Sequence, residues 1–176
     1  MKKILILFFT FVSISAFSQN ADSTKITKFS DRINLGGSFG LMFGTTTNID
    51  ISPTVSYIFN KKFSAGIGVV YNYISLNQYN FRTNIYGGKI FANFLAYENI
   101  FLHAEYEILN LQTDPFDWAG LYPNQDRFYS ESLFVGGGYR QYINEKSFFS
   151  IMILFDLNHN MNSFHENPLI RAGFNF

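Results

Sequence analysis

Apolar and polar residues alternate with a period of two along most of the chain from residue 33 onward, which indicates β-strands. In residues 100–108, Ile100, Leu102 and Ala104 fall on one face, whereas His103 and Glu105 fall on the other. Such segregation predicts strands with one apolar and one polar face. Eight segments show the pattern, at residues 33–43, 48–59, 63–75, 85–95, 100–108, 133–140, 148–158 and 168–176.

The connections between these segments alternate in length. Short turns fall at 60–62, 97–99 and 144–146, and mostly longer loops fall at 76–84, 110–131 and 158–167. Short turns at one end and longer loops at the other are typical of transmembrane β-barrels. We therefore predict an all-β fold, an eight-stranded antiparallel up-and-down transmembrane β-barrel over residues 33–176. Pro53 cannot donate to a strand ladder, so we expect a bulge or irregular pairing near it.

The sequences of both terminal segments predict a location in the outer membrane. Residues 168–176 place Phe174 and Phe176 on the apolar face, which predicts a C-terminal signal for the outer-membrane assembly machinery. Residues 1–18 combine two early lysines, an apolar run and small residues before the end, and predict a cleavable signal peptide ending at Ser18. An uncleaved anchor is the alternative, but the apolar run is shorter than about 18 residues. Residues 19–32 then form a polar periplasmic segment.

Composition narrows the classes of function. The chain has 22 Phe and 11 Tyr, and it has 13 basic and 13 acidic residues. Loss of residues 1–18 would leave 11 basic residues and no basic field, so no nucleic-acid partner is expected. The sequence has no cysteine, which excludes disulfides and thiolate metal sites. We predict no cofactor, and outer-membrane lipid with lipopolysaccharide as the surroundings of the barrel.

Four motifs carry a resemblance to known proteins: Ile33-Asn-Leu-Gly-Gly-Ser-Phe-Gly40, Phe101-Leu-His-Ala-Glu-Tyr-Glu107, Val135-Gly-Gly-Gly-Tyr-Arg140 and Asn167-Pro-Leu-Ile-Arg171. With these the chain resembles the small eight-stranded outer-membrane β-barrel proteins of the OmpA-transmembrane and OmpX kind. It is more closely similar to a group of Bacteroidota outer-membrane β-barrel domain proteins of uncharacterised role. The resemblance implies a fold and a location, and it implies no reaction.

The polar face of the predicted strands carries a set of ionisable residues. An eight-stranded barrel is only wide enough for its own side chains, so we expect these groups to pair as an ionic network in the lumen. The alternative is a catalytic carboxylate pair formed by Glu105 and Glu107, which stand two residues apart on one strand. The predicted network comprises Asp50, Lys89, His103, Glu105, Glu107, Arg140, Asp156 and Arg171.

An outer-membrane enzyme that modifies lipid A is the enzymatic alternative. Some eight-stranded outer-membrane barrels act on lipid A with a histidine, a serine and an acid. His103 has Glu105 rather than a serine two positions along, and His159 and His165 lie in a loop near Ser163. The two loop histidines with Glu166 match no common metal-ligand spacing. We therefore predict no catalytic residue and no metal site.

The loop at 110–131 is the candidate for recognition of an extracellular protein, a glycan or lipopolysaccharide. Its aromatic residues have polar neighbours; the alternative is that they pack on the barrel rim. Asp114, Asp117 and Asp126 could hold a hard cation, but their spacing is not that of an EF-hand. The candidate recognition residues are Phe116, Trp118, Tyr122, Phe128 and Tyr129.

The sequence thus favours a non-enzymatic envelope component or surface-binding scaffold in the outer membrane. A lipid-modifying enzyme, a narrow pore and a soluble lipocalin-like barrel are the alternatives. A lipocalin-like barrel would need a charged outer face, which the many Gly, Ser and Asn residues at the polar positions supply poorly.

Overall fold

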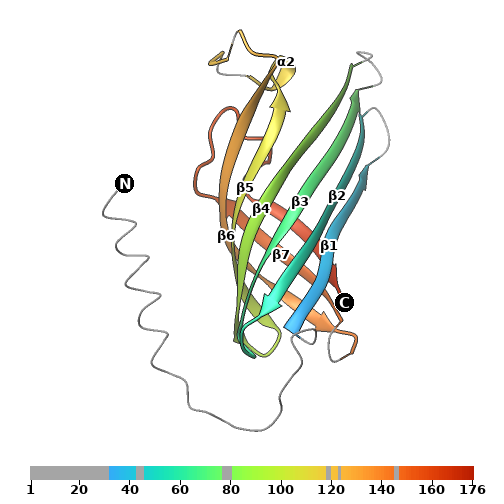
Figure 1. Cartoon of the computed structure of the whole chain (residues 1–176), viewed down its shortest axis with the longest axis vertical. Helices are drawn as coiled ribbons and strands as arrows, with labels where there is room; N and C mark the ends of the chain where they lie inside the picture. The colour runs from blue at the N-terminus through green and yellow to red at the C-terminus, as the bar shows by residue number, and fades with distance from the viewer. Residues whose placement is uncertain (1–31, 43–45, 77–80, 118–119, 123, 145–146) are drawn as a thin grey trace, which may run out of the picture.

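The computed structural model describes residues 32–42, 46–76, 81–117, 120–122, 124–144 and 147–176. Each strand pairs antiparallel with the next along the chain and β8 pairs with β1, which closes the sheet into an eight-stranded barrel (Figure 1). The predicted all-β, eight-stranded antiparallel up-and-down barrel is therefore confirmed. In chain order the elements are β1 (Ile33–Met42), β2 (Thr46–Ile58), β3 (Phe63–Leu76), β4 (Phe81–Tyr97), β5 (Ile100–Gln112), α2 (Thr113–Phe116), β6 (Arg127–Tyr142), β7 (Phe148–Asp156) and β8 (Leu169–Asn175).

The predicted signal peptide at 1–18 and most of the segment 19–32 lie outside the described residues. Among the described residues, no helix is long and apolar enough to cross a membrane.

Two strand pairs are longer than the alternation predicts. The β5–β6 ladder continues from Ile108 opposite Glu131 to Gln112 opposite Arg127, so the connecting segment is 113–126 rather than 110–131. Likewise the β3–β4 ladder continues to Leu76 opposite Phe81, and the predicted loop at 76–84 is mostly strand. The polar residues there still pair because the ladder bonds are made by the backbone, whatever the side chain.

Pairing is irregular at Pro53, as the sequence predicts. The β2–β3 register runs to Ile51 opposite Tyr71 and resumes at Thr54 opposite Gly68, with no pair at Ser52 or Pro53. The register is the same on both sides of this gap, so the irregularity is a missing rung and not a bulge. A register shift does occur between Leu95 and Tyr97, where β4 approaches its turn.

The seam between β1 and β8 is short. Two pairs form it, Gly36 with Asn175 and Gly37 with Phe174, and the Phe176 N–H donates to the Leu35 carbonyl at 2.7 Å. On its other side β1 pairs with β2 throughout, from Ile33 to Met42. The part of β1 from residue 38 to 42 therefore has β2 on one side and, among the described residues, no pair to β8 on the other.

The two faces of the barrel wall have opposite chemistry. Large apolar side chains on all eight strands face outward and are exposed, whereas the inward positions hold most of the buried polar residues. One row of outward residues consists of direct cross-strand partners from β1 to β6: Leu35, Val55, Ile67, Ile90, Tyr106 and Leu133. Ile153 and Ile170 form the matching pair on β7 and β8.

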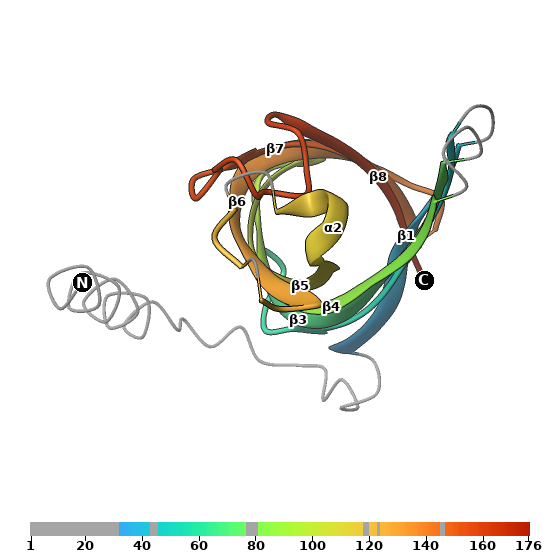
Figure 2. The same cartoon turned by 90° about the horizontal axis from the view of Figure 1, so that it is seen from above.

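The interior is divided along the barrel axis. Toward the long connections it holds a buried apolar cluster, against which Phe116, Tyr122 and Phe164 pack. Viewed from above, α2 lies across the mouth of the barrel at this end (Figure 2). The lumen is therefore only partly the ionic interior that the sequence predicts, because segment 113–126 and segment 157–168 fold inward and need apolar neighbours. The buried cluster consists of Val70, Ile85, Leu109, Leu111 and Phe128.

Candidate functional site

Glu105 is the centre of a buried ion cluster at mid-height in the barrel. Its Oε2 lies 3.3 Å from Lys89 Nζ and 3.4 Å from His103 Nε2, and its Oε1 lies 2.7 Å from Arg171 Nη1. These residues come from β4, β5 and β8, so the cluster connects strands on different sides of the wall. A buried carboxylate needs several such partners because burial removes its hydration.

Glu107 extends this cluster toward the long connections. Its Oε1 lies 2.8 Å from His165 Nε2, and its Oε2 lies 3.8 Å from Arg171 Nη2. His165 belongs to segment 157–168, which folds back into the barrel and places its ring against Phe134 and Phe164. Arg171 thus bridges the two glutamates, and the loop histidine closes the cluster from above.

Five of the eight predicted network residues come together: Lys89, His103, Glu105, Glu107 and Arg171. The other three have different partners. Asp50 accepts hydrogen bonds from Ser52 Oγ at 3.1 Å and Asn72 Nδ2 at 3.3 Å. Asp156 accepts from the backbone N–H groups of Leu133 and Asn158, near the end of β7.

Arg140 is the exception among the lumen bases. Its guanidinium lies 5.2 Å from the ring centre of Tyr142 and 5.3 Å from that of Phe148. Within the described part of the chain it forms no ion pair with a carboxylate, and its Nε is buried without a hydrogen-bond partner. The expectation that Arg140 joins the ionic network is wrong in this respect, because Arg140 lies near the short turns, away from both glutamates.

Two of the three histidines considered for catalysis, His103 and His165, have structural partners. His103 Nδ1 lies 2.7 Å from Asn93 Oδ1, its Nε2 faces Glu105, and its ring stacks on Phe91 at 5.8 Å. Asn93 is the direct cross-strand neighbour of His103. His165 is held by Glu107, while His159 is exposed. Both nitrogens of His103 are thus engaged by an amide and a carboxylate.

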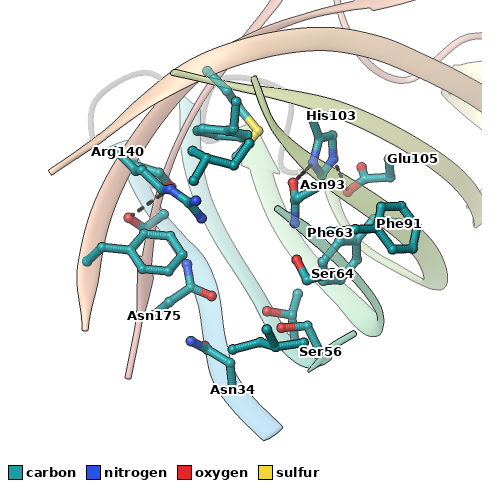
Figure 3. Close-up of a pocket in the computed structure, with 18 of the residues that line it drawn as sticks. Asn34, Ser56, Phe63, Ser64, Phe91, Asn93, His103, Glu105, Arg140 and Asn175 are labelled. Atoms are coloured by element: carbon teal, nitrogen blue, oxygen red, sulfur yellow. Dashed lines mark hydrogen bonds and ion pairs between the residues drawn. The ribbon is translucent and has the colours of Figure 1, made fainter. Parts of the chain in front are cut away.

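A cavity of about 190 Å³ lies below the ion cluster, at the end of the barrel that carries the short turns. Figure 3 shows His103, Glu105, Asn93 and Phe91 on one side of it and Arg140 and Asn175 on the other. Phe63 and Ser64 of β3 and Ser56 of β2 line it lower down. The polar interior that the sequence predicts is therefore found in this half of the barrel.

The four described aromatic residues of the predicted recognition loop do not gather on one surface. Phe128 belongs to β6 and is 2% exposed inside the barrel, and Tyr122 stacks on it with ring centres 4.9 Å apart. Phe116 packs edge-on against Phe164 at 6.0 Å. Tyr129, the next residue of β6, points outward and is 68% exposed. Trp118 lies outside the described residues, and recognition by this loop stays a prediction.

Asp117 joins the two long connections. Its carboxylate accepts hydrogen bonds from the Tyr122 N–H at 2.8 Å, the Leu121 N–H at 3.0 Å and Asn162 Nδ2 at 2.9 Å. Partial desolvation raises its pKa, but these donors together outweigh that effect and hold the pKa below its ordinary value of 3.8. Asp117, which the sequence suggests as a possible cation ligand, therefore has a structural role. It accepts the hydrogen bonds that hold the two long connections together.

The sequence indicates His165 only as a loop histidine, and neither its place in the ion cluster nor the apolar cluster is predicted. His165 lies in a segment without periodicity, 58 residues from Glu107 along the chain, so no local signal pairs the two. The apolar cluster did leave a signal. Residues 108–111 read Ile-Leu-Asn-Leu, which puts Leu109 and Leu111 on the same face as Glu105 and Glu107. This lapse in the polar face marks the level at which the interior becomes apolar.

Comparison with known protein families finds no match, and comparison with curated proteins finds none. Among solved structures, the chain is similar to the N-terminal β-barrel domain of Pseudomonas aeruginosa OprF. The similarity covers 82% of this chain and 98% of that one, at 12% sequence identity and a TM-score of 0.42. The class of protein rests on the chain's own strand pairing, which defines a closed eight-stranded antiparallel β-barrel.

Proposed function

We propose that this protein is an integral outer-membrane β-barrel protein that serves as a non-enzymatic envelope component or surface-binding scaffold. The observation that carries the proposal is the row of cross-strand partners from Leu35 to Leu133, continued by Ile153 and Ile170. The aliphatic members of this row are 41% to 67% exposed. A soluble monomer rarely exposes a contiguous apolar surface beyond a few hundred Å².

Lipid accounts for this surface. Removing apolar area from water is favourable by about 25 cal/mol per Å², and a closed barrel satisfies its backbone groups within the wall. Strands β2 to β6 have 13 to 17 residues, more than the roughly 9 to 11 that cross an apolar layer. The excess length lies toward the long connections, as expected for the outer side of such a barrel.

The interior of the barrel supports a role that involves neither catalysis nor ion conduction. The two glutamates that could form a catalytic pair already interact with other side chains. Their partners are Lys89, His103, His165 and Arg171. Above them the interior holds the buried apolar cluster around Ile85 and Leu111, and a packed apolar layer opposes the passage of ions. A ligand of the scaffold would then meet the outer end of the barrel, where Leu121 of the connection and Tyr129 of β6 are exposed.

Export and assembly belong to the same proposal. Residues 1–18 would direct export, and the outward Phe176 with Phe174, whose rings meet at 4.6 Å, would present β8 to the assembly machinery. The likeness to Bacteroidota barrels of uncharacterised role is part of this reading of the sequence and stays a prediction.

Membrane fractionation followed by electrophoresis with and without boiling tests the proposal. The protein should be in the outer-membrane fraction, and the unboiled sample should run as a faster, compact band. A soluble protein with no heat-dependent shift contradicts it and favours the lipocalin-like reading. Mass analysis of lipid A with and without expression separates the scaffold from an enzyme, and conductance in planar bilayers separates it from a pore. The scaffold predicts no change in either.

A further inference from the structure

We propose that the cavity at the short-turn end of the barrel is a binding site for a small oxyanion, a carboxylate or a phosphate group, held by Arg140. This assigns a ligand site to the periplasmic half of the lumen, which the scaffold role alone does not require. Three observations support it: an excess of positive charge among the described lining residues, an arginine with no acidic partner among them, and space for a ligand.

The charge of the cavity lining is strongly unbalanced. Among the described residues that line it, five are Lys or Arg and one, Glu105, is an acid. Glu105 already binds Lys89 and Arg171, and both of these lie at the closed inner end. The lining bases without a described ion pair are Arg140, Lys61 and Lys62.

Arg140 has the donors to bind an anion, and among the described residues it has no carboxylate partner. Its side chain is held beside the faces of Tyr142 and Phe148, which fixes the guanidinium plane without neutralising its charge. The buried Nε has no hydrogen-bond partner within the described part of the chain, although a buried donor normally has one. A guanidinium presents its donors in a planar fork that matches carboxylate and phosphate oxygens.

The remaining lining residues suit an oxyanion. Asn93, Asn175, Ser56 and Ser64 bring amide and hydroxyl groups to the cavity wall, and these can donate to further oxygens. The volume of about 190 Å³ is more than ten times the roughly 10 to 15 Å³ that one water molecule requires. Lys61 and Lys62 are exposed on the turn at the mouth, where they raise the local concentration of anions.

A titration followed by NMR tests the site. We would label the full chain with ¹⁵N, hold it in a maltoside detergent that carries no phosphate, and follow the arginine Nε–Hε signals at low salt. Inorganic phosphate or acetate should shift the Arg140 signal saturably. Arg140→Gln, in which binding is followed by the Nε–Hε signal of Arg171 on the same cavity wall, should weaken binding by about tenfold or more, because hydrogen bonds between charged partners contribute that much. Arg82→Gln, which removes an exposed arginine at the far end of β4, should leave binding unchanged.

Two further measurements keep the proposal open to refutation. The double variant Lys61→Gln, Lys62→Gln should bind the anion more slowly and with a weaker dependence on salt, while the Arg140 signal still shifts. This variant tests the site even if Arg140→Gln fails to fold. A short-chain phosphatidic acid that binds more tightly than inorganic phosphate would identify a lipid headgroup as the source of the oxyanion. Equal affinities would identify a soluble one. No saturable shift of Arg140, or equal binding by Arg140→Gln, would overturn the proposal.

Discussion

Arg171 Nη1 on β8 lies 2.7 Å from Glu105 Oε1 on β5, inside the barrel and 66 residues apart in the sequence. The pair links two strands that are not neighbours in the sheet. Lys89 and His103 also contact the Glu105 carboxylate, which therefore connects side chains of β4, β5 and β8. This ion cluster therefore occupies the middle of the narrow barrel interior.

Glu105→Gln should destabilise the barrel strongly. The substitution leaves Lys89 and Arg171 buried with less neutralising charge, and loss of one partner of a buried pair costs about 3 to 5 kcal/mol. The urea concentration at which the heat-modifiable band disappears measures the effect. Glu166→Gln makes the same change at an exposed glutamate and should leave this concentration unaltered. Equal behaviour of the two variants would show that the cluster contributes nothing to folding.

Gly136→Ala should also lower stability, through packing rather than charge. A Cβ at this position of β6 would overlap the carbonyl oxygen of Ile153 on β7, so the strands must separate. Overpacking of this kind costs about 1 to 3 kcal/mol. Gly88→Ala is the matched control, because its Cβ would meet no atom nearer than the Gly68 oxygen at 3.7 Å. The same urea series compares the two, and a Gly136→Ala barrel as stable as the control would contradict the close approach.

The short seam predicts uneven hydrogen exchange within β1. Backbone N–H groups between Ser38 and Met42 that point away from β2 have no described partner on β8, so they should exchange faster than those of β4 and β5. Exchange followed by NMR in detergent resolves single residues. Uniform protection along both edges of β1 would mean that β8 pairs with it over the full length in solution.

The contacts of Asp117 should give the outer loops a dependence on pH. Its pKa is lower in the folded protein than in the unfolded chain, so its stabilising effect is complete above the ordinary value of 3.8 and declines as pH falls through the folded pKa. Limited acid proteolysis at decreasing pH should therefore cut segment 113–126 more readily. Asp117→Asn should be cut readily at every pH. Cleavage that depends on pH equally in both forms would assign the effect to another group.

The strands could be predicted because each one has an outer and an inner face that differ in polarity. The alternation of apolar and polar residues, such as Leu102 and His103, follows from this difference. The cross-barrel pairs could be predicted only as a set of charges. Which base meets Glu105 depends on strand register and barrel closure, and the position of Arg140 near the turns excluded it from the cluster. The inward fold of His165 and Phe164 depends on contacts far along the chain, which no local pattern contains.

The claim that the barrel spans a membrane is tested most directly by measuring which of its residues contact lipid. The chain has no cysteine, so single cysteines can be introduced at Leu35, Ile67 and Ile153 on the outer face and at Asn72 on the inner face, and labelled with a nitroxide. In reconstituted bilayers the three outer labels should be reached by oxygen and hidden from a water-soluble nickel reagent, and the inner label should show no lipid contact. Outer labels that the nickel reagent reaches as readily as oxygen would contradict a membrane-spanning barrel.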